Sequence, residues 1–325
     1  MIHRENAMKY YIALDSGGYK TQGVLFDQTG TVHAYEYGRG ANAFDVGPEE
    51  ATSRLCFAVD RLRDRLPAGE KIRGVFGSVS AVFYYPEIEE KITRHVGFAK
   101  CRMDSVVTSV MAPVLGKDDG VCLISGTGSY CCIREAGKHR HYIGSSGYML
   151  DTGGSGYVLG RQALIATQRE RDGRGPSTLL TPILEEEMGE TLREHLPAIY
   201  AGGRTYISSF AHAVFTARKQ GDPVATRIFN DGVNYYEEAM QTAFRIMGKP
   251  YKAVLGGGVF IHIPEYAQAV CARAPQGCEM KVLDTPTLYG AALEAMWLCN
   301  EDIPAGFKTR FIETYEAQPN LRTGW

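Results

Sequence analysis

The sequence has no large excess of charge of either sign and no long apolar run. Its 35 Lys and Arg residues nearly balance 37 Asp and Glu residues, which gives a formal net charge of -2 at pH 7. Proteins that mainly bind nucleic acid or an anionic membrane usually carry a basic surface, so this balance argues against both partners. No apolar run approaches the roughly 20 residues that a membrane span needs.

The start of the chain lacks the features of a signal peptide. The first residues, MIHRENAMKYY, contain neither an apolar core nor a small-residue cleavage site. Met8 is a candidate native start, because the first expected strand begins directly after it. From these features we expect a cytoplasmic protein.

Cysteines are present, but not at the spacing of a structural metal site. None of the 8 cysteines forms a CxxC pair, and no His stands at finger-like spacing from them. This pattern argues against a structural zinc site. Most of the cysteines lie in apolar stretches, where a buried free thiol is the simplest interpretation.

Two common phosphate-binding signatures are also missing. A Walker A loop requires GxxxxGK[ST] ahead of a helix, and the chain contains no such string. A dinucleotide fingerprint requires GxGxxG at the start of a helix, whereas the glycine loops of this chain are followed by strand-like sequence. With 325 residues, 44% hydrophobic content and 37 glycines, the composition is typical of an α/β protein of roughly two domains.

Both halves of the chain open with the same pattern. Residues 9–14 and 22–26 are strand-like and flank the turn DSGGYKT, and a third expected strand follows at 31–37. Residues 120–125 and 130–134 flank the turn GTGS in the same way. Such a duplication predicts two similar lobes with a ligand cleft between them. A pair of ordinary glycine hairpins is the simpler alternative.

The rest of the chain alternates between helical and strand-like segments. Helical periodicity predicts helices at 48–66, 155–171, 208–217, 224–248, 265–274 and 288–298. Further strands are expected at 74–79 and 253–255. We divide the chain into an N-terminal lobe of residues 1–117 and a C-terminal lobe of residues 118–325, whose last helical segment can pack back on the N-terminal lobe.

Each glycine hairpin is a candidate phosphate site. Glycine lets backbone N–H groups approach an oxyanion without a Cβ in the way. Asp15, at the end of its strand, is placed to hold Mg²⁺ through water, with a turn-capping role as the equal alternative. The candidate phosphate ligands are Gly17, Gly18, Tyr19, Lys20 and Thr21 in the first hairpin and Gly126, Thr127, Gly128 and Ser129 in the second.

Three glycine motifs follow one another along the chain: DSGGYKT at 15–21, ISGTGSYC at 124–131 and LGGGVF at 255–260. Together they resemble the sugar kinase–actin–Hsp70 superfamily, in the form typical of its N-acetylglucosamine kinase and BadF/BadG/BcrA/BcrD ATPase branch. The resemblance implies an α/β fold of two ribonuclease-H-like lobes that uses ATP and Mg²⁺, with Gly256, Gly257 and Gly258 beside the adenosine. Dimers are common among such kinases, so it also allows a homodimer.

The resemblance also implies a catalytic base. Asp104 precedes a small-residue helix roughly twenty residues upstream of GTGS, where such kinases place an Asp that accepts the proton of the sugar hydroxyl. In a loose phosphoryl-transfer transition state the base mainly orients the hydroxyl, so an ordinary carboxylate is sufficient. The structural alternative is that Asp104 is the N-cap or a first-turn acid of the helix.

Sugar contacts follow from the same resemblance. Asn42 and Phe44, in the segment GRGANAF, match a stretch that contacts the sugar in this branch, and Ser78 matches a residue that lines the pocket. Thr127 and Gly128 are expected to face both the sugar and the phosphates.

The chain departs from the family pattern in GYMLDTGGSGYVLG, residues 147–160. The family's Asp-Glu pair falls on Thr152 and Gly153, which leaves Asp151 as the nearest carboxylate. In one interpretation, Asp151 and Thr152 contact the hydroxyls of N-acetylglucosamine after a one-residue slip. In the other, the pocket has lost a carboxylate and accepts a larger, anionic sugar such as N-acetylmuramic acid, whose lactyl carboxylate a buried acid would disfavour.

The leading hypothesis is therefore an ATP- and Mg²⁺-dependent kinase for a hydroxyl, by resemblance the 6-OH, of an amino sugar. The main alternative is an ATPase activator of the 2-hydroxyacyl-CoA dehydratase or benzoyl-CoA reductase type. Such activators hold an iron–sulfur cluster through cysteines, and Cys101, close to Asp104, is the candidate ligand. A third possibility is an inactive sugar-sensing relative, against which the intact Asp15, Asp104 and glycine turns argue.

Overall fold

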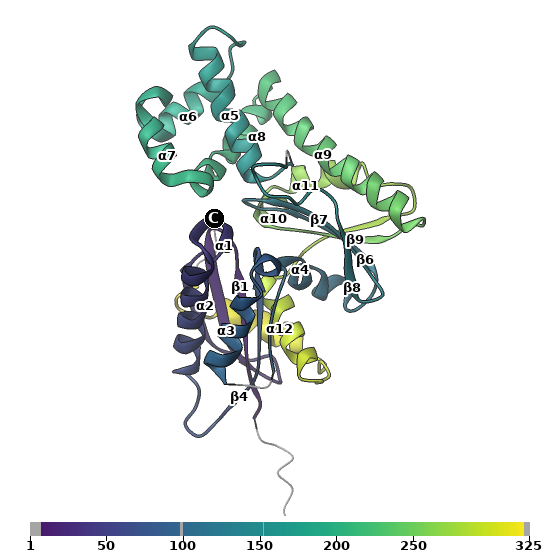
Figure 1. The fold of residues 1–325 in the computed structure, drawn as a ribbon. Helices are drawn as coiled ribbons and strands as arrows, with labels where there is room; N and C mark the ends of the chain where they lie inside the picture. Colours follow the sequence, from purple (N-terminus) through teal and green to yellow (C-terminus); the bar gives the residue numbers. More distant parts are fainter. Residues whose placement is uncertain (1–7, 98–99, 152, 322–325) are drawn as a thin grey trace, which may run out of the picture. The chain divides into compact units, whose positions relative to one another are not determined.

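A computed structural model describes residues 8–97, 100–151 and 153–321 (Figure 1). By their contacts the described residues divide into two compact units: those within 8–116 and 284–321 form the first, and those within 117–283 form the second. The boundary expected at 117/118 lies next to this division. Residues 284–321, which we placed in the C-terminal lobe on sequence grounds, belong to the first unit.

The described residues of the first unit form a five-stranded sheet in the order β3-β2-β1-β4-β5. Strand β2 pairs antiparallel with both β1 and β3, whereas β4 pairs parallel with β1, and β5 pairs parallel with β4. The strands are β1 (Tyr10–Ser16), β2 (Lys20–Asp27), β3 (Val32–Arg39), β4 (Ile72–Val79) and β5 (Cys101–Asp104).

Both faces of this sheet are covered, because successive side chains of a strand point to opposite faces. On one face, Ile12 and Leu14 of β1 share an apolar cluster with helices α2 (Pro48–Arg63) and α3 (Glu87–Val96). On the other, Tyr11 and Ala13 pack with α12 (Thr287–Leu298) and α13 (Phe307–Glu316). The short elements α1 (Ala43–Val46) and η1 (Val82–Tyr84) and the helix α4 (Val106–Leu115) complete the unit.

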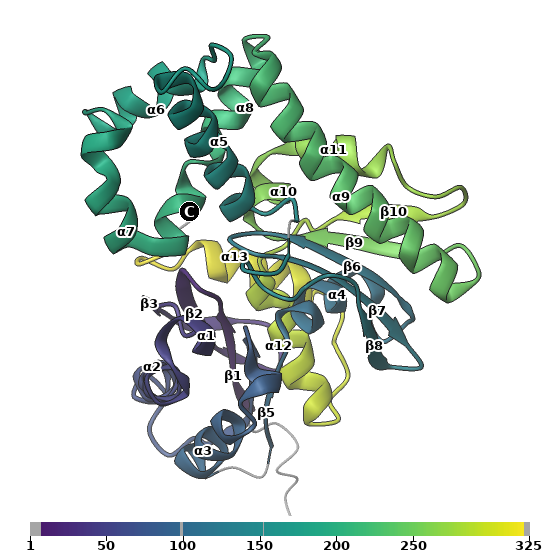
Figure 2. The same cartoon turned by 45° about the horizontal axis from the view of Figure 1, so that its top comes forward.

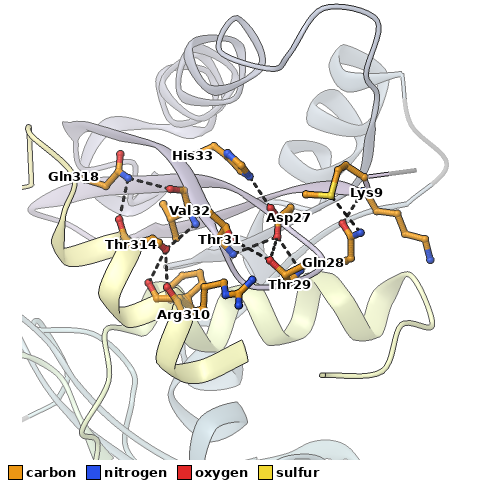
Figure 3. A network of polar contacts seen from close by, with 12 residues as sticks. Lys9, Asp27, Gln28, Thr29, Thr31, Val32, His33, Arg310, Thr314 and Gln318 are labelled. Carbon is orange, nitrogen blue, oxygen red and sulfur yellow. Dashed lines mark hydrogen bonds and ion pairs between the residues drawn. The ribbon is translucent and has the colours of Figure 1, made fainter. Parts of the chain in front are cut away.

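Helix α13 and Gln318, which follows it, are hydrogen-bonded to the outer strand β3 (Figure 3). The Val32 amide donates to Thr314 Oγ1 at 2.9 Å, and Gln318 Nε2 donates to the Val32 carbonyl at 3.1 Å. These bonds use the backbone groups of an edge strand that would otherwise need water. They explain why the C-terminal helix belongs to the first unit.

The second unit repeats the same topology. Its described residues form a five-stranded sheet in the order β10-β9-β6-β7-β8. Strand β7 pairs antiparallel with both β6 and β8, whereas β9 pairs parallel with β6, and β10 pairs parallel with β9. The strands are β6 (Gly120–Ser125), β7 (Ser129–Glu135), β8 (Lys138–Tyr142), β9 (Lys252–Gly256) and β10 (Glu279–Val282). The predicted internal duplication is therefore confirmed: each central strand leads into a glycine hairpin.

Helices cover one face of the second sheet and share a single large apolar cluster with it. Figure 2 shows α5 to α8 gathered beside the sheet and α9 running across it. The helices are α5 (Gly156–Arg171), α6 (Leu180–Met188), α7 (Leu192–Ser209), α8 (Ala211–Lys219), α9 (Pro223–Met247), α10 (Gly258–His262) and α11 (Pro264–Cys271). In the described parts of the chain, no helix is long and apolar enough to cross a membrane.

Candidate active site

The predicted site residues fall into two groups, one in each unit. The first unit carries Asp15, Gly17, Gly18, Tyr19, Lys20, Thr21, Asn42, Phe44, Ser78 and Asp104, and the second carries Gly126, Thr127, Gly128, Ser129, Asp151, Gly256, Gly257 and Gly258. Thr152 lies outside the described residues.

Three of these side chains form a row at the carboxyl ends of β1, β4 and β5. The parallel register pairs Asp15 with Ser78 and Ser78 with Asp104. Neighbouring strands are about 4.8 Å apart, so the two acids stand roughly 10 Å from each other across two strand spacings. Ligands of open α/β sheets bind at the carboxyl ends of the strands, which makes this row the candidate reaction centre of the first unit.

Asp15 is a carboxylate whose surroundings disfavour its charge. Burial raises its pKa, and the Thr287 hydroxyl, the Lys20 ammonium and the Ser78 hydroxyl oppose this rise without cancelling it. Thr287 Oγ1, at the start of α12, donates to Asp15 Oδ2. A nearby cation would stabilise this carboxylate, so Asp15 fits the role of a residue that holds Mg²⁺ through water.

Ser78, in the middle of the row, is fully buried. Its Oγ makes no hydrogen bond with any described residue, although the hydroxyl lies close enough to Asp15 to favour the ionised carboxylate. Buried hydroxyls almost always have a partner, so an orphan between two acids fits a polar ligand that completes the site.

Asp104 ends β5 and is 3% exposed. Its Oδ1 accepts from the Ser105 amide at 2.7 Å, and its Oδ2 accepts from Arg102 at 2.5 Å. The N-cap of α4 is Ser105, whose hydroxyl accepts from the Val107 amide at 3.3 Å, and the first turn of α4 contains no acid. The structural alternative that made Asp104 the N-cap or a first-turn acid is therefore wrong.

A pocket of about 860 Å³ opens beside Asp104. Arg102 and Met103 of β5 form one part of it, together with residues of η1 and α3. Its other lining residues are Val82, Phe83, Pro86, Glu89, Glu90, Thr93 and Arg94. The first unit thus offers a pocket lined by both charged and apolar side chains at the end of the row where the predicted base lies.

The first glycine hairpin is braced by the segment after β3. The Gly17 amide donates to the Lys20 carbonyl at 3.0 Å, which closes the turn, and the Gly40 amide donates to the Tyr19 carbonyl at 3.1 Å. A Cβ on Gly40 would overlap the backbone of Gly18. The hydroxyls of Ser16 and Thr21 lie 2.7 Å apart at the base of the turn. The hairpin is therefore held in one shape by contacts that need glycine at position 40.

The predicted sugar segment continues from this brace. Asn42 is buried and caps α1, with its Oδ1 accepting from the Phe44 amide at 3.0 Å. The Phe44 ring is 55% exposed and lies 5.1 Å from the Tyr84 ring and 5.9 Å from the Tyr85 ring, measured between centroids. The segment thus presents an exposed aromatic surface beside a buried amide.

The second glycine hairpin is attached to the N-terminus of α5. The Gly156 amide donates to the Gly126 carbonyl at 2.7 Å, and the Tyr157 amide donates to the Thr127 carbonyl at 3.3 Å. These bonds satisfy first-turn amides that a helix cannot pair internally. Within the hairpin, the Gly126 amide donates to the Gly128 carbonyl at 2.9 Å and closes the turn.

The predicted adenosine motif lies against this hairpin. Gly257 follows β9 with φ of 90°, a conformation that favours glycine. A Cβ at this position would stand 2.5 Å from the Ser125 carbonyl oxygen. The structure thus brings the predicted adenosine and phosphate motifs of the second unit together.

Asp151 is bound to protein groups. Its Oδ2 accepts from the Ser145 amide at 2.6 Å and from the Tyr235 hydroxyl at 2.9 Å. Oδ2 of Asp151 therefore already has two hydrogen-bond donors from the protein, whereas the slip interpretation requires this carboxylate to contact a sugar hydroxyl.

Sequence reasoning missed three partners of the predicted residues. Arg102 had a detectable signal, because residues two apart on a strand share a face with Asp104. Thr287 and Tyr235 had none, since they reach Asp15 and Asp151 from helices distant in the sequence.

The chain is similar to known proteins over most of its length. The chain is 26% identical over 267 residues to an N-acetylmuramic acid/N-acetylglucosamine kinase of Clostridium acetobutylicum, covering 79% of this chain and 87% of that protein. It is 23% identical over 261 residues to an N-acetyl-D-glucosamine kinase of Dictyostelium discoideum, covering 73% and 80%. A solved structure of a candidate N-acetylglucosamine kinase from Chromobacterium violaceum shares the fold, with a TM-score of 0.70 and 22% identity over 89% of this chain and 98% of that one.

A family model matches most of the chain and confirms the resemblance drawn from the glycine motifs. It spans residues 12–285, from β1 through both glycine hairpins to the segment after β10. The chain therefore belongs to the BadF/BadG/BcrA/BcrD ATPase family.

Proposed function

We propose that this protein is a kinase that transfers the γ-phosphoryl group of ATP to a hydroxyl, the 6-OH, of an N-acetylated amino sugar. The two curated relatives are named for kinase activity on N-acetylglucosamine, and one of them also for N-acetylmuramic acid. The observation that carries the proposal is the row formed by Asp15, Ser78 and Asp104 in register across three parallel strands.

In this proposal Asp104 accepts the proton of the sugar hydroxyl and orients the hydroxyl for attack. Its burial and its two hydrogen bonds fix the carboxylate in place. Ser78, fully buried beside Asp15, supplies a hydroxyl that can bond to the ligand. Phosphoryl transfer depends mainly on positioning and on charge stabilisation. Asp104 and Ser78 would provide the positioning.

Asp15 would hold Mg²⁺ through water at the opposite end of the row. The ion, when bound with ATP, supplies positive charge that neutralises the phosphate oxygens during transfer. The hairpin amides of both units bind nucleotide phosphates, with Lys20 beside the first hairpin. Burial lowers the pKa of Lys20, and Asp15 counteracts that shift.

The cysteines do not favour the alternative of an iron–sulfur ATPase activator. Burial raises the pKa of the Cys101 thiol to about 11. A cluster ligand is a thiolate, so this environment opposes the required form.

A homodimer remains a prediction, which sedimentation of the purified protein tests.

Replacement of Asp104 by Asn tests the proposal. We expect D104N to lower kcat by about 10²- to 10⁴-fold, the usual contribution of a general base, while sugar binding measured by calorimetry stays similar. D64N is the matched control, since Asp64 is an exposed residue at the end of α2. Near-full activity of D104N would remove Asp104 from the mechanism.

The acceptor is identified by a coupled ADP-release assay with N-acetylglucosamine, N-acetylmuramic acid, glucosamine and glucose. We expect the two N-acetylated sugars to be phosphorylated most efficiently, with the product phosphate on O6 by NMR. ATP consumption that does not depend on any sugar would contradict the kinase assignment.

A further inference from the structure

The segment that differs from the family pattern is built around the carboxylate of Asp151. Asp151 Oδ2 receives two hydrogen bonds, from the Ser145 amide and from the Tyr235 hydroxyl. Ser145 has φ of 62°, a left-handed conformation that is costly for a residue with a side chain. The surrounding contacts therefore fix the Ser145 amide in its position facing the carboxylate.

The residues just before this segment are attached to the strand that leaves the second glycine hairpin. Ser145 Oγ accepts from the Cys131 amide at 3.0 Å, and the Ile143 amide donates to the Cys131 carbonyl at 2.9 Å. Cys131 is the third residue of β7, which begins at Ser129. Through Ser145, Asp151 is thus coupled to the backbone two residues beyond the hairpin.

A second connection reaches the hairpin directly. A Cβ on Gly153 would overlap Ser129 Oγ and stand 2.8 Å from the Tyr235 ring, so Gly153 packs tightly between the two. Burial raises the pKa of Tyr235, the Asp151 charge raises it further, and the Ser129 hydroxyl opposes the rise. Tyr235 therefore stays protonated at neutral pH and remains a donor to Asp151.

We propose that Asp151, Ser145 and Tyr235 form a clamp that fixes Ser129 and the second glycine hairpin for nucleotide binding. Asp151 is then a positioning residue of the nucleotide site and not a ligand of the sugar. The inference rests on the proposed function, because it takes the second hairpin to bind the phosphates of ATP.

The physical reason lies in how closely a phosphate loop must be held. Hydrogen bonds to an ionised carboxylate are about twice as strong as neutral ones. A binding loop that is displaced by a fraction of an ångström loses much of its function, so supporting residues contribute to affinity without touching the ligand. The clamp supports the hairpin in this way: Asp151 connects Tyr235 of α9 to Ser145, and Ser145 in turn binds Cys131 of β7.

Tyr235→Phe and Asp151→Asn, with the double variant, test the clamp. The direct readout is the Kd of Mg²⁺-ATP by calorimetry without sugar, followed by KM for ATP and for N-acetylglucosamine. We expect each single variant to weaken ATP binding by about tenfold, the effect of one lost bond to a charged group. We expect the sugar KM to change less than twofold, and the double variant to resemble the single ones.

Tyr200→Phe is the matched control, because Tyr200 is 84% exposed on α7, and it should leave all constants unchanged. A higher sugar KM in Asp151→Asn, with unchanged ATP binding and a silent Tyr235→Phe, would overturn the clamp and make Asp151 a sugar ligand. Equal loss of ATP and sugar binding, with a lower melting temperature, would also overturn it. Because ATP binding is measured without turnover, a wild type that binds ATP but phosphorylates no sugar would contradict the proposed function and leave the clamp testable.

Discussion

The guanidinium of Arg102 donates to Oδ2 of Asp104 at 2.5 Å, while the Ser105 amide donates to Oδ1 at 2.7 Å. Both oxygens of the proposed base therefore have a donor. The Arg102 side chain is 57% exposed and lies on the wall of the pocket beside Asp104. The pair joins a solvent-accessible cation to a buried acid on one face of a short edge strand.

Arg102→Gln tests whether this pair positions the base. A partly exposed ion pair is worth roughly 1 kcal/mol, so we expect kcat to fall by about fivefold while KM for ATP stays unchanged. Arg94→Gln is the control, since Arg94 lines the same pocket from α3. A higher kcat in Arg102→Gln would show instead that Arg102 restrains the base.

Gly40→Ala tests the brace of the first hairpin. The added Cβ would overlap the backbone of Gly18, and overpacking usually costs about 1–3 kcal/mol. We expect the Kd of Mg²⁺-ATP to rise by about tenfold or more, as measured by calorimetry. Gly38→Ala is a matched control two residues earlier, near the end of β3, because nothing lies within 4 Å of its Cβ position. Equal affinities of the two variants would remove the brace from nucleotide binding.

Asp15→Asn should stabilise the protein while impairing its function. Burial raises the pKa of Asp15, so the folded protein takes up a proton more readily than the unfolded chain. Stability is therefore lost as pH rises from the unfolded pKa of about 3.9 through the raised folded pKa. We expect D15N to melt at a higher temperature than wild type at pH 7, with the difference vanishing at low pH. Lower kcat and weaker Mg²⁺ dependence should accompany it.

Asp27 lies at the end of β2, away from the glycine turn. Its replacement by Asn should lower the stability of the protein at neutral pH, the opposite of the effect expected for Asp15. Burial by itself raises its pKa, but hydrogen bonds from Thr29, His33 and Thr31 outweigh it and leave the pKa lowered. Its stabilising contribution is present above the unfolded pKa and is lost as pH falls through the lowered folded pKa. We expect D27N to lose about 2 kcal/mol of unfolding free energy at pH 7 by urea titration, and less at pH 3. A uniform loss at both pH values would contradict this linkage.

The sequence by itself determined the local elements of this protein. The glycine turns, the alternating strands around them and the helical periodicity of α2, α5, α9 and α12 all follow from short-range rules. The repeated order of strand, glycine turn and strand was enough to predict two lobes of one topology. Segments with weak patterns, such as β5, β10 and α13, were missed because their stability comes from packing on the rest of a unit.

Only the tertiary structure decided which of these residues lie side by side. The register of β1, β4 and β5 places Asp15, Ser78 and Asp104 in one row, and parallel pairing between distant segments has no local signal. Thr287 and Tyr235 reach their carboxylates from helices far along the chain. Hydrogen bonds of this kind depend on how sheets and helices pack, and the sequence pattern around either partner does not contain that information.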